Sequence, residues 1–346
     1  MIPLSAAPMK TESWQAQLSD AYCDIRELLA DLGLSAHYRP EMALAAETFG
    51  FRVPRYFAAL MKKADIHDPL LLQVLPTAAE LQPVPGFSRD PLGDMAAHEG
   101  NGILHKYSGR VLLIGTGACA INCRYCFRRH FPYSDHLALK NQWQPALQQL
   151  QQDTGIHEVI LSGGDPLSLG NSRLETLIKA LEQIPHLQRL RIHTRLPVVL
   201  PARIDRQLSE LLGNTTLATS MVIHANHPQE LTEELKQALY PLRQGGVTLL
   251  NQSVLLKNIN DDASTQVLLC ESLFAAGVLP YYLHQLDAVQ GAAHYAVDDQ
   301  AALTLHRRME RQLPGYLLPR LVREIEGAQS KQTLLRSQNR KKCFCR

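Results

Sequence analysis

The sequence lacks any long hydrophobic run. None of its apolar stretches approaches the ~18 residues that a membrane-spanning helix needs, because the longest, such as 111–114 and 221–223, have the length of a strand. The first residues, MIPLSAAPMKTESWQ, contain no apolar core of the length found in signal peptides. We therefore expect a soluble, cytoplasmic protein with no membrane partner.

An excess of charge of one sign is also missing. The 346 residues carry 35 Lys and Arg against 33 Asp and Glu, a formal net charge of +2. Binding to nucleic acid usually depends on many contacts from Lys and Arg to phosphates, so this balance argues against a nucleic-acid partner. The composition is that of a globular protein, and the length suits one domain of barrel size with an accessory segment.

Cysteines are few, and their spacing is informative. Seven is an odd number in a chain without an export signal, so a disulfide framework is not expected. Three of them form a C-x3-C-x2-C motif at positions 119, 123 and 126. Three thiolates at this spacing can hold a [4Fe–4S] cluster and leave one iron open to a substrate or cofactor. The alternative is a zinc site with His130 as the fourth ligand.

The surroundings of this motif favour the cluster. A strand-like run at 110–115 precedes it, Gly117 opens the loop, and the aromatic Tyr125 stands before the last cysteine. These features match the cysteine loop of the radical S-adenosylmethionine (radical SAM) superfamily.

The hydrophobic pattern changes along the chain. Residues 1–98 are expected to be mostly helical, with helices within 13–34 and 55–63 and a proline-rich loop over 75–92. This region carries no catalytic constellation, so we expect it to serve packing or contacts between subunits. After residue 105, short apolar runs alternate with helical patterns. The runs are 110–115, 157–161, 189–193, 217–223, 247–254, 279–284 and 316–322, and the helical patterns are 141–152, 171–183, 203–212, 228–243, 263–276 and 297–312.

This alternation predicts an α/β fold. About six βα units and a final strand form an open, partial (β/α)6-type barrel over 99–331, as in radical SAM enzymes. A basic tail over 332–346 follows. The loops that leave the C-terminal ends of the strands carry the functional residues in such barrels, and the cysteine loop follows the first predicted strand.

Polar residues follow several other predicted strands, and each permits two interpretations. Gly163 and Gly164 form either a simple tight turn or a contact to the methionyl part of SAM. The polar residues 191, 193 and 195 share one face of a strand, which points either into the barrel mouth or to solvent. His224 is a core histidine or a ligand contact. The amides at 251 and 252 need polar partners, so a ligand contact is plausible there.

Two residues near the end of the barrel are equally ambiguous. Asp287 either caps a helix or binds a cationic group of a substrate. Lys331 is a solvated surface lysine unless a carbonyl cofactor binds beside it, in which case it can form a Schiff base.

Together these segments resemble the lysine 2,3-aminomutases, a radical SAM family that also uses pyridoxal 5′-phosphate (PLP). The similar stretches are HKYSGRVLLIGTGACAINCRYCFRR (105–129), SGGDPL (162–167), TRLPVVLPARI (194–204), HANHP (224–228), NQSVLLKNIND (251–261) and PYYLHQLDAVQGAAHY (280–295). The resemblance covers about 90–331 with the motifs in the same order. The chain length, the FRRHFPY segment (127–133) and the brief tail are most similar to the members that serve modification of elongation factor P.

The resemblance implies roles for individual residues. Lys331 matches the lysine that bonds covalently to PLP. Arg128 matches the arginine that holds the substrate carboxylate, and Asp287 and Glu324 match two acids that hold the substrate's ε-ammonium. The matches to the cluster ligands are Cys119, Cys123 and Cys126. The matches in segments that contact SAM are Gly163, Gly164, Asp165, His224 and Gln252, and those in a segment that contacts PLP are Tyr107 and Arg110.

The reaction implied by the resemblance is a radical 1,2-amino shift that converts L-lysine to (R)-β-lysine, with a [4Fe–4S] cluster, SAM and PLP as cofactors. The implied partners are an electron donor such as flavodoxin or ferredoxin and, downstream, elongation factor P with its separate β-lysine ligase. Three features depart from the larger aminomutases. Glu324 replaces an Asp, Gly-Ala-Gln-Ser replaces a glycine run before Lys331, and the sequence ends 15 residues after Lys331, without their long C-terminal region.

Other hypotheses remain open from the sequence. An aminomutase for another amino acid such as glutamate would need Lys or Arg where Asp287 and Glu324 stand. A non-catalytic Fe–S redox protein would leave Lys331 and Arg128 without a purpose. The C-x-C pair at 343 and 345 either binds a metal or is incidental.

Overall fold

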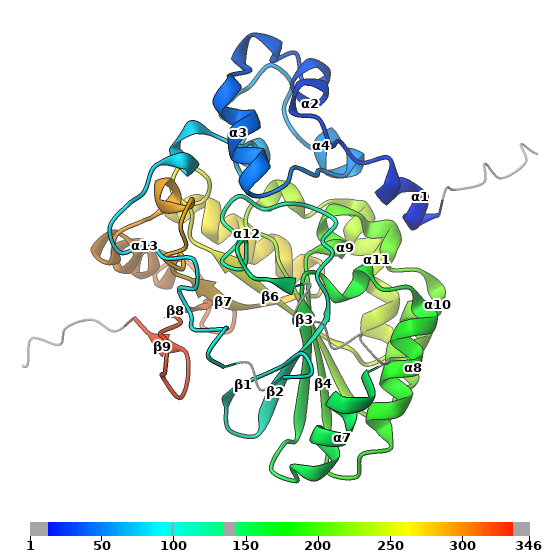
Figure 1. Cartoon of the computed structure of the whole chain (residues 1–346). Coiled ribbons are helices and arrows are strands. Elements are labelled where there is room, and N and C mark those ends of the chain that lie inside the picture. Colours follow the sequence, from blue (N-terminus) through cyan, green and yellow to red (C-terminus); the bar gives the residue numbers. More distant parts are fainter. Residues whose placement is uncertain (1–12, 98–99, 134–142, 335–346) are drawn as a thin grey trace, which may run out of the picture.

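A single sheet organises the molecule. The computed structural model describes residues 13–97, 100–133 and 143–334 (Figure 1). Nine strands follow one another across the sheet in chain order. The strands are β1 (Ile103–Tyr107), β2 (Arg110–Thr116), β3 (Glu158–Gly163), β4 (Arg189–Thr194), β5 (Ala218–Ile223), β6 (Thr248–Val254), β7 (Leu279–His284), β8 (Arg320–Arg323) and β9 (Gln332–Thr333).

The sheet is parallel from β2 to β8 and open. Strands β1 and β9 lie antiparallel on its two edges. Each parallel strand pairs with the one before it in the chain, so every connection is a simple crossover. Among the described residues no pairing joins β1 to β9, so the sheet stays an incomplete barrel, as the sequence predicts.

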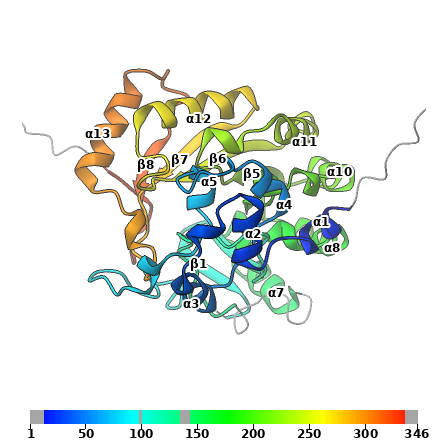
Figure 2. The same ribbon diagram turned by 90° about the horizontal axis from the view of Figure 1, so that it is seen from above.

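Helices cover the outer face of the sheet (Figures 1 and 2). They are α7 (Gln144–Gln152), α8 (Asn171–Glu182), α10 (Arg206–Asn214), α11 (Glu233–Gln244), α12 (Ala263–Ala275) and α13 (Asp299–Glu310). Helix α8 buries Leu174, Leu177, Ile178 and Leu181, a single stripe at helical spacing. Helices α10, α12 and α13 each begin after an Asp whose side chain accepts a hydrogen bond from the first turn. The Asp caps fix where these helices begin, and the leucine stripe of α8 packs toward the strands.

The N-terminal region lies over the end of the barrel where the strands finish. Figure 2 shows its helices above the middle of the ring of strands. They are α1 (Trp14–Ser19), α2 (Ile25–Asp31), α3 (Pro40–Thr48), α4 (Arg55–Ala59) and α5 (Pro69–Leu72). Tyr56 bonds to Thr232 at 2.6 Å, and Gln73 donates to Glu230 at 3.0 Å, so this region contacts loops that follow β5. The cavity described below lies beneath it.

The expected elements and the observed ones differ mainly at their ends. The stretch 13–34 holds two helices, because Tyr22 pairs with Val53 in an antiparallel bridge between them. The pattern at 228–243 divides into a 3-10 turn at Pro228–Glu230 and α11. Strands β1 and β9 and helices α3 and α5 were not predicted. Part of the expected tail, Gln332–Thr333, belongs to β9, whereas 335–346, with the C-x-C pair, and 1–12 lie outside the described residues.

The helices in the described ranges are all too short or too polar to cross a membrane.

Candidate active site

One cavity of about 640 Å³ gathers every site residue predicted from the sequence. Its size is that of a site for a cofactor and a small substrate. The predicted residues that line it are Cys119, Cys123, Cys126, Tyr107, Arg110, Arg128, Gly163, Gly164, Asp165, His224, Gln252, Asp287, Glu324 and Lys331. They come from β1, β2, β3, β6 and the loops that follow the strands, so segments far apart in the chain meet in one space.

The three thiols of the cysteine loop face this cavity. Burial, together with repulsion from the Cys123 thiol, raises the pKa of Cys126 to about 11, so this thiol must lose its proton when it binds iron. Among the residues that the structure describes, no three His, Cys, Asp or Glu side chains converge on a point as a single metal ion would require. His130 instead contacts the backbone oxygen of Gln290 at 3.1 Å. A cluster that takes one thiolate per iron fits this arrangement better than zinc does.

A buried ion-pair network holds the cysteine loop to the N-terminal region. Glu80 Oε2 accepts from Arg124 Nη2 at 2.6 Å and from Arg129 Nη2 at 2.7 Å. The side chains of Glu80 and Arg124 are fully buried. Arg124 also donates to the backbone oxygens of Ala45 and Gly50. The N-terminal region therefore fixes the position of the loop, a role that the sequence did not reveal.

The turn after β3 is locked against the same loop. Gly164 N donates to Thr116 O at 2.7 Å, and Asp165 N donates to Ala118 O at 2.8 Å. A Cβ atom on Gly164 would lie 2.4 Å from Ala118 O, and Gly163 has a φ of 117°, so both positions require glycine. This close approach leaves the cavity wall there lined by main chain, which suits a polar head group.

The carboxylate of Asp165 is fully engaged in hydrogen bonds within the protein. It accepts hydrogen bonds from Leu167 N, Arg195 N, Leu196 N and the Thr194 hydroxyl. These bonds tie the end of β3 to the end of β4. We therefore expect Asp165 to hold the two strand ends in position around a SAM site.

The polar residues 191 and 193 of β4, with Arg195 just after the strand, line the cavity. Arg191 pairs with Glu158 at 2.6 Å, and Arg195 Nη1 lies 2.7 Å from Cys123 Sγ. Arg195 Nη2 donates to Gln73 at 2.7 Å, which links β4 to the N-terminal region. The sequence left the direction of this face undecided, and the structure turns it inward.

Histidines form the neutral part of the wall. His224 bonds to Gln252 at 2.7 Å, and burial lowers the pKa of His224 to about 3. The Nε2 atoms of His193 and His284 are buried and have no hydrogen-bond partner among the described residues. Burial also holds the pKa of both rings well below its usual range. Buried, unpaired ring nitrogens of this kind are suited to a bound polar ligand.

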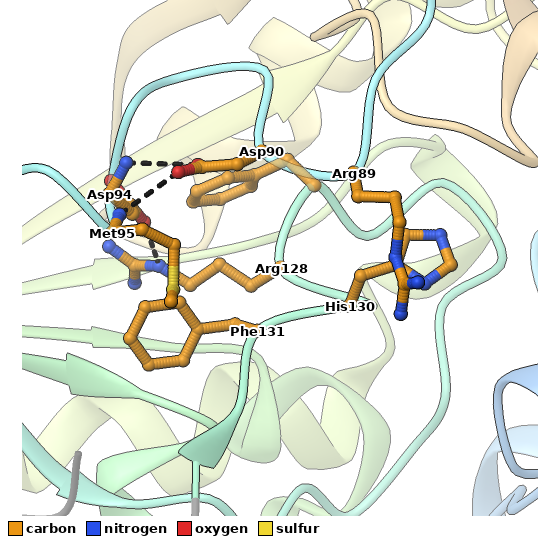
Figure 3. A pocket seen from close by; sticks show the side chains of 8 residues that line it. Arg89, Asp90, Asp94, Met95, Arg128, His130 and Phe131 are labelled. Atoms are coloured by element: carbon orange, nitrogen blue, oxygen red, sulfur yellow. Dashed lines mark hydrogen bonds and ion pairs between the residues drawn. The ribbon is translucent and has the colours of Figure 1, made fainter. Parts of the chain in front are cut away.

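A row of alternating charges borders the cavity, and we name it the charge row. Its members are, in order, Arg128, Asp94, Lys106, Glu324 and Lys331. Four of its five members line the cavity, and the fifth, Asp94, is buried beside Arg128 and Lys106. Arg128 Nε donates to Asp94 Oδ2 at 2.6 Å (Figure 3), and Lys331 Nζ donates to Glu324 Oε2 at 2.5 Å. Lys106 joins the two pairs by contacting Asp94 and, at 3.6 Å, Glu324.

Two members of the charge row were not predicted. Asp94 comes from an irregular loop of the N-terminal region and is buried. Although burial alone would raise its pKa, Arg128 and Lys106 lower the pKa of Asp94 to about 2, so it is charged at working pH. Lys106 lies in one of the similar stretches, but nothing in the sequence distinguished it from a surface lysine.

Asp287 lies near Glu324 of the charge row. Its Oδ1 atom is buried and has no hydrogen-bond partner among the described residues. Burial, and next the repulsion from Glu324, raises the pKa of Asp287 to about 7. This carboxyl is therefore available for a cation that enters the cavity.

The raised pKa of Asp287 predicts a pH-dependent effect on stability. The carboxyl of Asp287 ionises near pH ~3.9 in the unfolded chain, whereas the folded, cofactor-free chain holds its proton until about pH 7. The free energy of unfolding therefore decreases as the pH rises from the first value to the second. Asp287→Asn should therefore stabilise the cofactor-free protein at about pH 8 and leave its stability unchanged below about pH 4. Urea denaturation at the two pH values measures this, and an equal effect at both would contradict the raised pKa.

Comparison with known proteins agrees with this geometry. The radical SAM superfamily model matches residues 113–264. The L-lysine 2,3-aminomutase of Escherichia coli K12 is 48% identical over 324 residues, 93% of this chain and 94% of that protein. The chain belongs to the L-lysine 2,3-aminomutase family. Its relative from Haemophilus influenzae is 45% identical, covering 96% of this chain and 98% of that one, and the one from Clostridium subterminale is 32% identical, covering 92% and 76%.

Membership of this family implies a [4Fe–4S] cluster, SAM and PLP. The residues present fit these groups. The thiols at 119, 123 and 126 line one cavity, the main chain at Gly164 forms a tight cradle beside them, and Lys331 opens into the same space. The unpaired nitrogens of His193 and His284 provide further polar contacts for a bound group.

Proposed function

We propose that this chain converts L-lysine to (R)-β-lysine in the cytoplasm, and that the product serves modification of elongation factor P through a separate ligase. The observation that carries the proposal is the charge row. Arg128 at one end suits a carboxylate, and Glu324, next to the other end, suits an ammonium together with the nearby Asp287. Lysine has these two groups at its opposite ends.

The proposed roles follow from the contacts of each residue. The cysteines at 119, 123 and 126 would hold the cluster, and the main chain at 163–164 would hold SAM. Lys331 would bond to PLP, with Tyr107 and Arg110 beside it. When bound, these groups supply a carbon radical that abstracts hydrogen and a π-system that delocalises the unpaired electron during nitrogen migration.

The protein residues orient the substrate and enclose it. Asp94 fixes Arg128 from one side, and the Ser162 hydroxyl accepts from Arg128 Nη1 at 3.2 Å. A guanidinium held in this way offers a fixed charge-assisted contact to a carboxylate. The N-terminal region lies over the ring of strands (Figure 2), and its Phe49 lines the cavity, so this region would limit access of water to the reacting atoms.

The organisation of the chain follows from this proposal. Residues 99–331 would form the catalytic barrel, 1–98 a cap that positions the cysteine loop, and 332–346 a basic tail. A flavodoxin or ferredoxin would supply the electron. A substrate with an anionic far end, such as glutamate, is disfavoured because Asp287 and Glu324 would repel it.

The test is an anaerobic assay of reconstituted protein with SAM, PLP, a reductant and L-lysine, with products resolved by mass spectrometry after chiral derivatisation. The wild type should form (R)-β-lysine, and Lys331→Ala should form none. Lys179→Ala, a change on the exposed face of α8, is the matched control and should keep full activity. SAM cleavage without β-lysine would move the substrate to another amino acid, and absence of bound PLP would favour an Fe–S redox protein.

The link to elongation factor P has its own test. Cells whose only copy carries Lys331→Ala should lose β-lysylated elongation factor P, as measured by mass spectrometry of the purified factor. Undiminished modification in these cells would refute this part of the proposal.

A further inference from the structure

The cofactor lysine and an acid proposed for the substrate are paired with each other in this structure. Lys331 Nζ donates to Glu324 Oε2 at 2.5 Å, and both side chains are largely buried. The other oxygen of Glu324, Oε1, lies 3.6 Å from Lys106 Nζ. The two oxygens of Glu324 thus face two different cations.

Because Lys331 and Lys106 balance the charge of Glu324, this carboxylate attracts a third cation only weakly. An ammonium that approached Glu324 would meet Lys331 and Lys106 at close range, and like charges in a partly buried site repel strongly. Asp287 is a weak substitute, because its raised pKa of about 7 leaves it only partly ionised near pH 7 while the cavity is empty.

We propose that Glu324 exchanges cations, so that it binds the Lys331 ammonium in the cofactor-free protein and the distal ammonium of the substrate only after Lys331 has bonded to PLP. The inference rests on the proposed function, because it takes lysine as the substrate. The nitrogen of Lys331 forms a C=N bond with the aldehyde carbon of PLP, the aldehyde oxygen leaves as water, and the nitrogen keeps at most one of its three N–H donors. Glu324 loses its partner at Oε2 in this step.

Lys106 acts as a positioning residue in this exchange. It is held by Asp94 and by the backbone oxygen of Leu92 at 2.9 Å, neither of which depends on Lys331. It can therefore keep Oε1 of Glu324 in place while the partner of Oε2 changes. The consequence is an order of binding in which the cofactor comes first and lysine second.

The exchange predicts that loss of the cofactor lysine improves binding of the substrate to PLP-free protein. In Lys331→Met the side chain keeps its length but loses its charge, which frees Glu324. Isothermal titration should show L-lysine binding to this PLP-free variant about tenfold tighter than to PLP-free wild type, since the competent state is no longer a minor one. L-norleucine, which lacks the distal ammonium, should bind both proteins equally.

Two further variants identify the residue responsible. Lys331→Arg keeps the positive charge and should show no gain. Lys331→Met combined with Glu324→Gln should lose the gain while still binding L-norleucine, which shows that it remains folded. If Lys331→Met does not fold, Lys331→Gln replaces it in the same titration.

The outcomes separate this inference from the proposed function. Equal affinities of Lys331→Met and wild type for L-lysine would overturn the exchange, even if the PLP-loaded wild type forms β-lysine. A gain that depends on Glu324 would support the exchange, even if the loaded enzyme left lysine unchanged and the proposed function failed.

Discussion

Reconstituted Cys123→Ala protein should hold no intact [4Fe–4S] cluster and should form no detectable β-lysine. Only three protein thiols face the cluster site in the described part of the chain, so the loss of one leaves an iron without a ligand. The fold should persist, because Cys123 lies in a loop that Glu80 anchors through its two neighbouring arginines. Iron and sulfide content and the electron paramagnetic resonance of the reduced protein measure the cluster directly.

The matched control is Cys23→Ser. Cys23 is exposed and belongs to the N-terminal region, away from the cavity lining, so its loss should change neither the iron content nor the activity. A Cys123→Ala protein that kept a full cluster and formed β-lysine would show that another residue supplies the ligand.

Replacing Glu80 by alanine should destabilise the protein by about 3–5 kcal/mol, because it leaves two buried guanidinium groups without their counter-ion. Arg124 keeps only backbone oxygens as partners, which satisfy its N–H groups but not its charge. The cysteine loop should lose its anchor as well, so iron retention should fall together with stability. The midpoint of chemical denaturation and the iron content of the same preparation measure the two effects.

Glu175→Ala is the matched control for this change. Glu175 pairs with Lys179 one turn away on α8, where both side chains are largely exposed, and such pairs contribute only about 0.3–0.5 kcal/mol. A loss of stability in Glu80→Ala no larger than in this control would contradict the anchoring role of the buried network.

The sequence predicted the barrel because each parallel strand is a short apolar run between amphipathic helices. The six runs from 110–115 to 279–284 all became strands. Every residue of β3 is buried, as in a parallel strand covered on both faces, whereas β4 and β6 alternate buried residues with more exposed ones. The edge strands β1 and β9 escaped prediction. Strand β1 has two buried residues, Ile103 and Leu104, before the polar His105 and Lys106, and β9 has two exposed residues, so neither shows a continuous buried run.

Most of the predicted site residues lie at or after the end of a strand, except Arg110, which begins β2, and Gln252, which lies within β6. Residues at such positions converge in a parallel barrel, so the sequence could bring them together. Asp94 lies in a loop and Glu80 in a short 3-10 helix (Ala78–Leu81), both before the first parallel strand, and their partners are 34 and 44 residues away. The spacing of residues along the sequence does not predict an ion pair between residues so far apart, so only the folded structure could reveal it.

The strand order has a consequence for synthesis of the protein. Because each strand pairs with its predecessor, the sheet can grow from one edge as the chain leaves the ribosome, without waiting for a distant segment. The cysteine loop and its anchor at Glu80 are complete once Arg129 has been added, whereas Lys331 arrives with the last strand, β9. A nascent chain can thus shape its cysteine loop long before it has the lysine that we propose bonds to PLP.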